Sequence, residues 1–160
     1  MNRLWAPWRM AYVGGSSAVV GCIFCTALAA DDDAKYLILR RSSRAFLILN
    51  AYPYTPGHLM AVINRHVGAL AEADAEELAD AMALAGQATG ALTDEYRAEG
   101  FNIGVNQGRV AGAGIEGHLH VHVVPRWNGD TNFMTTLGES RVLPEALDAT
   151  YARLRRRLGG

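Results

Sequence analysis

The sequence has no long apolar run, no excess of charge of either sign and few cysteines. No stretch approaches the roughly 18 apolar residues of a membrane helix, and residues 1–8 lack the continuous apolar core of a signal peptide. With 15 basic and 16 acidic side chains, the formal net charge is -1, so no general cationic field attracts nucleic acid. These absences predict a cytoplasmic protein that binds neither membrane nor nucleic acid and holds any anionic ligand locally.

The two cysteines, Cys22 and Cys25, are only three positions apart. In a reducing compartment such a pair favours metal ligands or redox thiols over a structural disulfide. Zinc needs two further ligands, and the candidates are His66 and His118. If all four bind, the protein fills every coordination position, so the zinc is structural and activates no water. The alternative is a pair of buried reduced cysteines, with His66 simply exposed at the surface.

A length of 160 residues with 50% hydrophobic and 19% charged residues is typical of one soluble globular domain. We expect a single domain over residues 1–160, with an aromatic N-terminal arm at 1–20 and a C-terminal extension and helix at 128–160. The tryptophan-rich segment at residues 4–9 is expected to pack on the body of the domain or on a partner subunit.

Hydrophobic periodicity predicts an α+β architecture. Strands are expected at residues 36–39, 45–50, 58–63 and 101–106. Helical spacing over residues 71–98 predicts one long amphipathic helix, with Asp74 as its N-cap and Gly100 closing it. Residues 144–158 predict a C-terminal helix, whose arginine-rich end complements the helix dipole better than it suits a nucleic-acid patch. With a strand at the histidines, this gives an antiparallel sheet of about five strands with both helices packed on one face of it.

The most unusual stretch is residues 117–126, where imidazoles alternate with apolar side chains. The histidines are His118, His120 and His122. Period-two alternation predicts a strand with one packed face, so Leu119, Val121 and Val123 should point away from the imidazoles. Neighbouring imidazoles then lie about 6.6 Å apart, where they repel when charged and lose hydration when buried. The pattern therefore indicates a pocket that binds an anion or a metal.

The loop before this strand is rich in glycine. It has three glycines in seven residues, namely Gly108, Gly112 and Gly114. Glycines let backbone N–H groups approach a phosphate closely, although glycine-rich turns are common in proteins of every function. Placed just before His120 and His122, the loop puts donors on one side of a phosphate and a nucleophile on the other. This arrangement suits phosphoryl or nucleotidyl transfer.

Residues 118–124 resemble the signature of the histidine triad superfamily of nucleotide hydrolases and transferases. The likeness extends over residues 20–127, through residues 46–50, Pro56-Gly57-His58, Asn106 and the glycine loop in the same order. Three further motifs are similar to a bacterial branch of diadenosine tetraphosphate phosphorylases or hydrolases. These motifs are residues 4–9, Cys22-Ile23-Phe24-Cys25 and Pro125-Arg126-Trp127.

The resemblance implies a role for each matching residue. The implied catalytic residues are His58, His118, His120 and His122, and the implied substrate-binding residues are Asn50, Asn106, Gly112, Gly114 and His122. In this scheme His120 attacks the α-phosphorus to form a nucleotidyl-histidine, and His122 contacts the phosphate or the leaving group. His58 helps to orient the site, and Asn50 binds the ribose hydroxyls. Asn106 and the backbone at Gly114 bind phosphate oxygens.

One position departs from the superfamily pattern. Four residues before the first triad histidine, eukaryotic branches usually have glutamine and some phosphorylases have serine, whereas this chain has Gly114. The loop therefore lacks a side-chain donor to the transferring phosphate. Because such an open loop leaves room for inorganic phosphate, it favours phosphate over water as the second nucleophile.

Three functions remain open from the sequence. The first is cleavage of dinucleoside polyphosphates, and the second is hydrolysis of nucleoside phosphoramidates or acyl-AMP by the same chemistry. The third is a non-catalytic nucleotide-binding scaffold, which the complete triad disfavours. The resemblance also implies a homodimer whose sheets join edge to edge, with the aromatic N-terminus and the last helix as candidate interface material.

Overall fold

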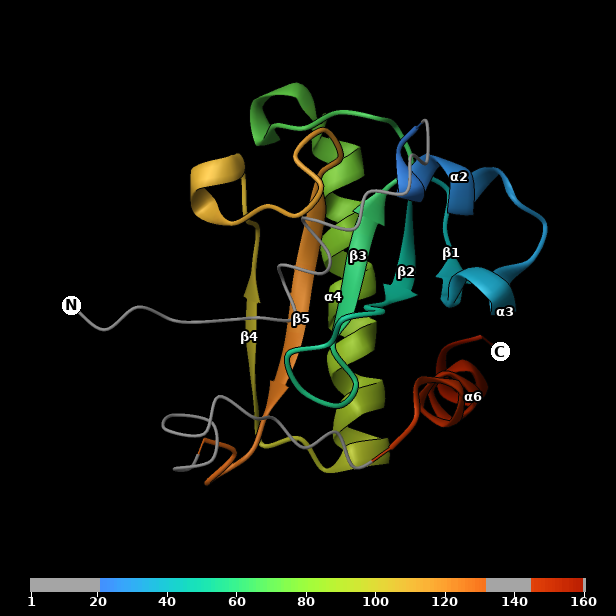
Figure 1. Cartoon of the computed structure of the whole chain (residues 1–160), viewed down its shortest axis with the longest axis vertical. Helices are drawn as coiled ribbons and strands as arrows, with labels where there is room; N and C mark the ends of the chain where they lie inside the picture. Colours follow the sequence, from blue (N-terminus) through green and yellow to red (C-terminus); the bar gives the residue numbers. More distant parts are fainter. Residues whose placement is uncertain (1–20, 132–144, 160) are drawn as a thin grey trace.

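The computed structural model describes residues 21–131 and 145–159 (Figure 1). The predictions for the aromatic arm at residues 1–20, and for a helix start at Pro144, lie outside the described residues. Within the described part, no helix combines the length and the apolar content that a membrane crossing requires.

A five-stranded antiparallel sheet forms the centre of the molecule, as predicted. Its strands are β1 (Ile38–Arg41), β2 (Ala45–Leu49), β3 (Leu59–Ile63), β4 (Gly100–Gly104) and β5 (His120–Arg126). The spatial order is β1-β2-β3-β5-β4, so the first three strands form an antiparallel meander. Strand β5 then lies between β3 and β4, which places the histidine strand inside the sheet.

Helix α4 (Ala75–Tyr96) runs along one face of the sheet (Figure 1). The main core lies between them and includes Leu119, Val121 and Val123, as the alternation predicted. Helix α6 (Leu147–Leu158) packs beside α4 against the edge strand β1 and adds Leu154 to this core. A smaller core under α2 (Ile23–Ala29) covers part of the opposite face, so the expectation that helices lie on only one face was incomplete.

The N-cap of α4 is Asp74, as predicted. The Asp74 carboxylate accepts a hydrogen bond from the Glu77 N–H at 2.8 Å, and the Glu77 carboxylate accepts one from the Asp74 N–H at 2.9 Å. The predicted start at residue 71 was too early, because Leu70–Glu72 form a separate 3-10 turn. The predicted stop at Gly100 was also wrong, since Arg97 adopts a left-handed conformation with φ 52° and closes the helix.

The largest differences between the predicted and the observed strand boundaries are at β1, β4 and β5. Residues Asp33–Tyr36 form a short helix, α3, whose first turn is capped by the Asp32 side chain. Leu37 then has a φ of 61°, which keeps it out of the strand, so β1 starts two residues later than predicted. Strand β4 ends at Gly104, two residues before the predicted end. Strand β5 begins at His120, while His118 precedes it.

The buried carboxylate of Glu77 generates a stability prediction. It accepts two hydrogen bonds from Arg65, at 2.9 and 2.7 Å, which together with the cap lower its pKa from 4.5 to about 2. Because the folded-state pKa lies below the unfolded value, this group stabilises the fold above pH 4.5, and that contribution disappears as the pH falls toward 2. Glu77→Gln should therefore lower the free energy of unfolding at pH 7 by about 1–3 kcal/mol.

Urea unfolding at a series of pH values measures this effect. Between pH 4.5 and 2, the free energy of unfolding should fall less in the variant than in the wild type. The matched control is Glu76→Gln, in the same helical turn but exposed to solvent, which should change the free energy of unfolding by less than about 0.5 kcal/mol. Parallel pH profiles for the wild type and Glu77→Gln would contradict the prediction.

Candidate active site

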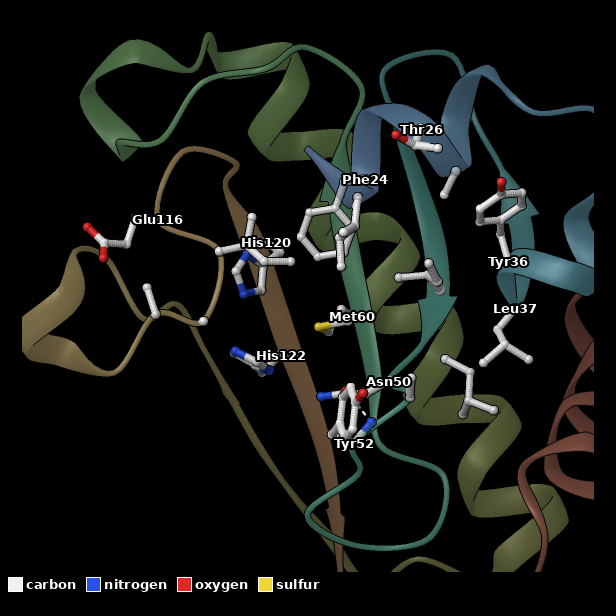
Figure 2. Close-up of a pocket in the computed structure, with 18 of the residues that line it drawn as sticks. Phe24, Thr26, Tyr36, Leu37, Asn50, Tyr52, Met60, Glu116, His120 and His122 are labelled. Carbon is white, nitrogen blue, oxygen red and sulfur yellow. Dashed lines mark hydrogen bonds between the residues drawn. The ribbon is translucent and has the colours of Figure 1, made fainter. Parts of the chain in front are cut away.

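A cavity of about 820 Å³ opens on the face of the sheet opposite α4 (Figure 2). Helix α2 forms one wall through Phe24 and its neighbours, and residues 109–116 of the glycine loop contribute to the other. The floor is formed by side chains of β2, β3 and β5, including Met60, His120 and His122. The volume is within the range of pockets that bind small organic ligands.

His120 is buried, and its ring points into this cavity (Figure 2). Its Nδ1 lies 2.7 Å from the backbone oxygen of His118. Because a carbonyl oxygen only accepts, Nδ1 carries the ring proton and Nε2 keeps its lone pair. Burial lowers the pKa of His120, which favours the neutral ring. The result is an uncharged imidazole with a nucleophilic nitrogen.

The neighbouring His122 has the complementary arrangement. The Tyr54 N–H donates to Nδ1 of His58 at 3.1 Å, so the His58 proton lies on Nε2. That Nε2 is 2.9 Å from Nδ1 of His122 and donates to it, which leaves the proton of His122 on its own Nε2. The amide nitrogen of Asn50 lies 3.2 Å from the same His58 Nδ1. His120 thus offers a lone pair to the cavity, and His122 carries an N–H donor. The centroids of the two rings are 5.0 Å apart.

The turn that holds His58 depends on Gly57. This residue has a φ of +78°, in the region that favours glycine, and an added Cβ would lie 2.6 Å from a Leu92 methyl carbon of α4. The turn can therefore close against α4 only without a side chain at this position. This explains the glycine before His58, which is fully buried immediately before β3.

A second cluster lies beside the histidines of β5 and contains the two cysteines. Sγ of Cys22 is 3.2 Å from Nδ1 of His118, and Sγ of Cys25 is 3.3 Å from Nδ1 of His66. All four ligand atoms lie within 4.8 Å of one another. Tetrahedral zinc, with bonds of about 2.3 Å to sulfur and 2.0–2.1 Å to nitrogen, places neighbouring ligand atoms about 3.5 Å apart. The donor set and its spacing therefore fit zinc.

The ring of His118 is oriented for this cluster by a main-chain contact. Its Nε2 donates to the backbone oxygen of Ile63 at 2.7 Å, so Nδ1 is the unprotonated nitrogen that faces the sulfur atoms. A hydrogen bond from the far nitrogen to a carbonyl oxygen is the usual support for a metal-binding histidine. His118 thus faces the cysteines with its ring and supports His120 with its backbone.

The sequence and the fold of this chain are both similar to those of one protein family. The family model described as HIT domain matches residues 33–129. The chain is 40% identical over 158 residues to a protein of Mycobacterium tuberculosis named AP-4-A phosphorylase, covering 94% of this chain and 80% of that protein. The chain belongs to the histidine triad (HIT) family. The resemblance drawn from the sequence is thereby confirmed.

Solved structures of HIT proteins share the fold. A zinc-bound histidine triad family protein from Mycobacterium smegmatis has a TM-score of 0.72 and 26% identity, covering 89% of this chain and 96% of that one. A hypothetical histidine triad nucleotide-binding protein from Sulfolobus tokodaii has a TM-score of 0.68 and 25% identity, covering 86% and 92%. The predicted HIT-like fold is therefore confirmed.

The structure brings most of the predicted HIT site residues together. The cavity is lined by Asn50, Gly112, Gly114, His120 and His122, with His58 behind His122. The predicted metal ligands Cys22, Cys25, His66 and His118 form the separate cluster. Three of the predicted catalytic and substrate-binding residues are not among those that line the cavity: His58, which lies behind His122, Asn106, and His118, whose ring faces the cysteines.

Sequence reasoning missed two groups that shape this HIT site. Phe24 packs its ring against both His118 and His120, at centroid distances of 5.4 and 5.2 Å. The sequence signal that could have identified Phe24 is its position between the two cysteines, because a metal bound by both cysteines would fix the residues between them. The second group is the Tyr54 N–H, which sets the tautomer of His58 and which no side-chain pattern reveals.

The two tautomers generate a prediction for the free protein at neutral pH. Long-range proton–nitrogen correlation spectra of the histidine rings should show His120 protonated on Nδ1 and His122 on Nε2. The His118 carbonyl oxygen can only accept, and the Tyr54 N–H, which acts on His122 through His58, can only donate. Single substitutions of His120 and His122 by Asn assign the signals. A His120 ring protonated on Nε2 would contradict the arrangement.

Proposed function

We propose that this HIT protein cleaves dinucleoside polyphosphates such as diadenosine tetraphosphate, through a covalent nucleotidyl-histidine at His120. The observation that carries the proposal is the lone pair on Nε2 of His120 beside the N–H of His122, within a cavity of nucleotide size. The 40% identity to a protein named AP-4-A phosphorylase supports the same substrate class.

In the first step, Nε2 of His120 attacks the α-phosphorus. An N–P bond forms, and the bond between that phosphorus and the bridging oxygen breaks, releasing ATP from diadenosine tetraphosphate. The ring of His120 becomes positively charged, and its Nδ1–H bond to the His118 oxygen strengthens as the charge develops. The N–H of His122 donates to a phosphate oxygen or to the departing oxygen, where negative charge accumulates.

In the second step, inorganic phosphate displaces AMP from His120 and gives ADP. The N–P bond breaks, and the electron pair returns to Nε2, which restores the neutral imidazole. Support for phosphate over water comes from the loop, where Gly114 lines the cavity without a side chain. The nucleotide site then consists of Asn50 at the ribose and of Gly112 and Gly114 at the phosphate.

Product analysis tests this proposal. With diadenosine tetraphosphate and phosphate, we expect ADP and ATP; AMP and ATP formed without phosphate would instead mean hydrolysis. Release of AMP from an adenosine phosphoramidate with no cleavage of the dinucleotide would contradict the proposed substrate class. Binding of AMP without turnover of either substrate would instead indicate a non-catalytic nucleotide-binding scaffold.

The variant His120→Ala should lose activity on every substrate by at least about a thousandfold, because the nucleophile itself is removed. Circular dichroism and AMP binding check that the variant remains folded with an intact cavity. The control is Asn128→Ala, which shortens an exposed side chain outside the cavity lining and should leave turnover unchanged. A His120→Ala enzyme with near-normal turnover would refute the mechanism.

We also infer that Cys22, Cys25, His66 and His118 bind one structural zinc ion. The distances among their ligand atoms, the support of the His118 ring by Ile63, and the zinc-bound HIT relative all favour this interpretation. Because the protein supplies four ligands, the ion has no open position for water. Its contribution is a crosslink between α2, the segment after β3 and the start of the histidine strand.

Metal analysis tests the zinc site. Protein prepared without chelator should contain about one equivalent of zinc per chain, and Cys22→Ser should lower both the zinc content and the melting temperature. Thr26→Ser, in the same helix but outside the ligand set, is the control and should keep its zinc. Less than about a tenth of an equivalent in the wild type would discard the site.

The homodimer implied by the family resemblance stays a proposal. Strand β4 lies at the edge of the described sheet, and its Ile103 is exposed, as is Val110 in the following turn. Pairing of β4 with its copy would cover this apolar edge. Analytical ultracentrifugation should give the mass of a dimer, and a monomer at micromolar concentration would contradict it. The cytoplasmic location also stays a prediction.

A further inference from the structure

The charged side chains of the cavity are few. They are Lys35, Arg109 and Glu116. Most arginines elsewhere in the described chain are engaged, and Arg65, Arg126 and Arg153 all form close ion pairs. The Arg109 guanidinium, in contrast, forms no hydrogen bond or ion pair with any other residue that the structure describes, and it is exposed. A cavity cation without a partner among the described residues is available to a ligand anion.

The cavity has two chemically different halves on either side of the triad histidines. Figure 2 shows Phe24 and Tyr36 on one side of His120 and Glu116 on the other. The half on the Phe24 side is lined mostly by apolar side chains of α2, β2 and the residue before β1, and its charged residue is Lys35. The other half is the glycine loop at residues 109–116, which carries Arg109.

The connectivity of a nucleotide determines which part occupies which half. A phosphate placed against apolar side chains would lose its hydration without compensation, so the apolar half suits the base. With the α-phosphorus at His120, the remaining phosphates must continue away from the base, toward the glycine loop. Lys35 belongs to α3, next to Tyr36 on the base side. Arg109 is thus the cation on the side that the leaving phosphates enter.

We propose that Arg109 binds the phosphates of the leaving nucleotide and thereby selects polyphosphate leaving groups over amines. The inference rests on the proposed nucleotidyl transfer at His120 and names the residue that sets its substrate class. A guanidinium can hold two phosphate oxygens at once through parallel N–H bonds. An amine leaving group offers no such oxygens, so Arg109 contributes nothing to its departure.

Substrate discrimination by Arg109→Gln tests the proposal. We expect kcat/KM for diadenosine tetraphosphate to fall about 10- to 100-fold, the loss of a charged hydrogen-bonding group. The kcat/KM for adenosine 5′-phosphoramidate should stay within about twofold. Arg109→Lys keeps the charge and should recover part of the loss. The matched control is Arg156→Gln, which removes an exposed charge of α6 far from the cavity lining and should change neither substrate.

Equal losses on both substrates would overturn the proposal, because Arg109 would then act on the shared AMP half or on the loop itself. An unchanged kcat/KM for the dinucleotide would overturn it as well.

A binding measurement keeps the test independent of turnover. In a His120→Asn background, Arg109→Gln should weaken ATP binding by about tenfold or more and leave AMP binding unchanged. If the wild type does not cleave the dinucleotide, the proposed function fails, and the ATP-to-AMP affinity ratio still decides the role of Arg109. A ratio that Arg109→Gln leaves unaltered would refute it.

Discussion

The hydrogen bond of 2.7 Å from Nδ1 of His120 to the backbone oxygen of His118 is the contact on which the site depends. It leaves Nε2 of His120 with its lone pair facing the cavity. The acceptor belongs to the residue whose ring faces the cysteines and is supported by the Ile63 oxygen. His118, just before β5, therefore joins the cysteine cluster, the sheet and the reacting imidazole.

The cysteine cluster and the cavity share helix α2. Cys22 is its N-cap and Cys25 lies in its first turn, while Phe24 between them packs on both His118 and His120. Other side chains of the same short helix form the wall of the apolar half. A helix of this length is marginal by itself, so tertiary contacts hold this wall of the cavity in place: Phe24 and Ala27 are buried, and Arg41 donates to the carbonyl oxygens of Leu28 and Ala30.

The sequence predicted the features that depend on local pattern. Period-two alternation identified the faces of the histidine strand, because strand geometry alone sets which side chains share a face. Features set by distant contacts were not predictable. The proton positions follow from the Ile63 oxygen and the Tyr54 N–H, and β1 starts late because of the left-handed Leu37. Likewise, only the assembled fold shows that Arg109 lacks a described partner and that Asn106 is not among the residues lining the cavity.

The proposed mechanism is tested most directly by identifying the residue that carries the nucleotide during turnover. Enzyme mixed with diadenosine tetraphosphate in the absence of phosphate, quenched within the first turnover at alkaline pH and digested, should yield a peptide of β5 increased in mass by one AMP group. Fragmentation should place the group on His120, and added phosphate should discharge it as ADP. AMP attached to His122, or substrate turnover with no labelled peptide, would contradict the mechanism.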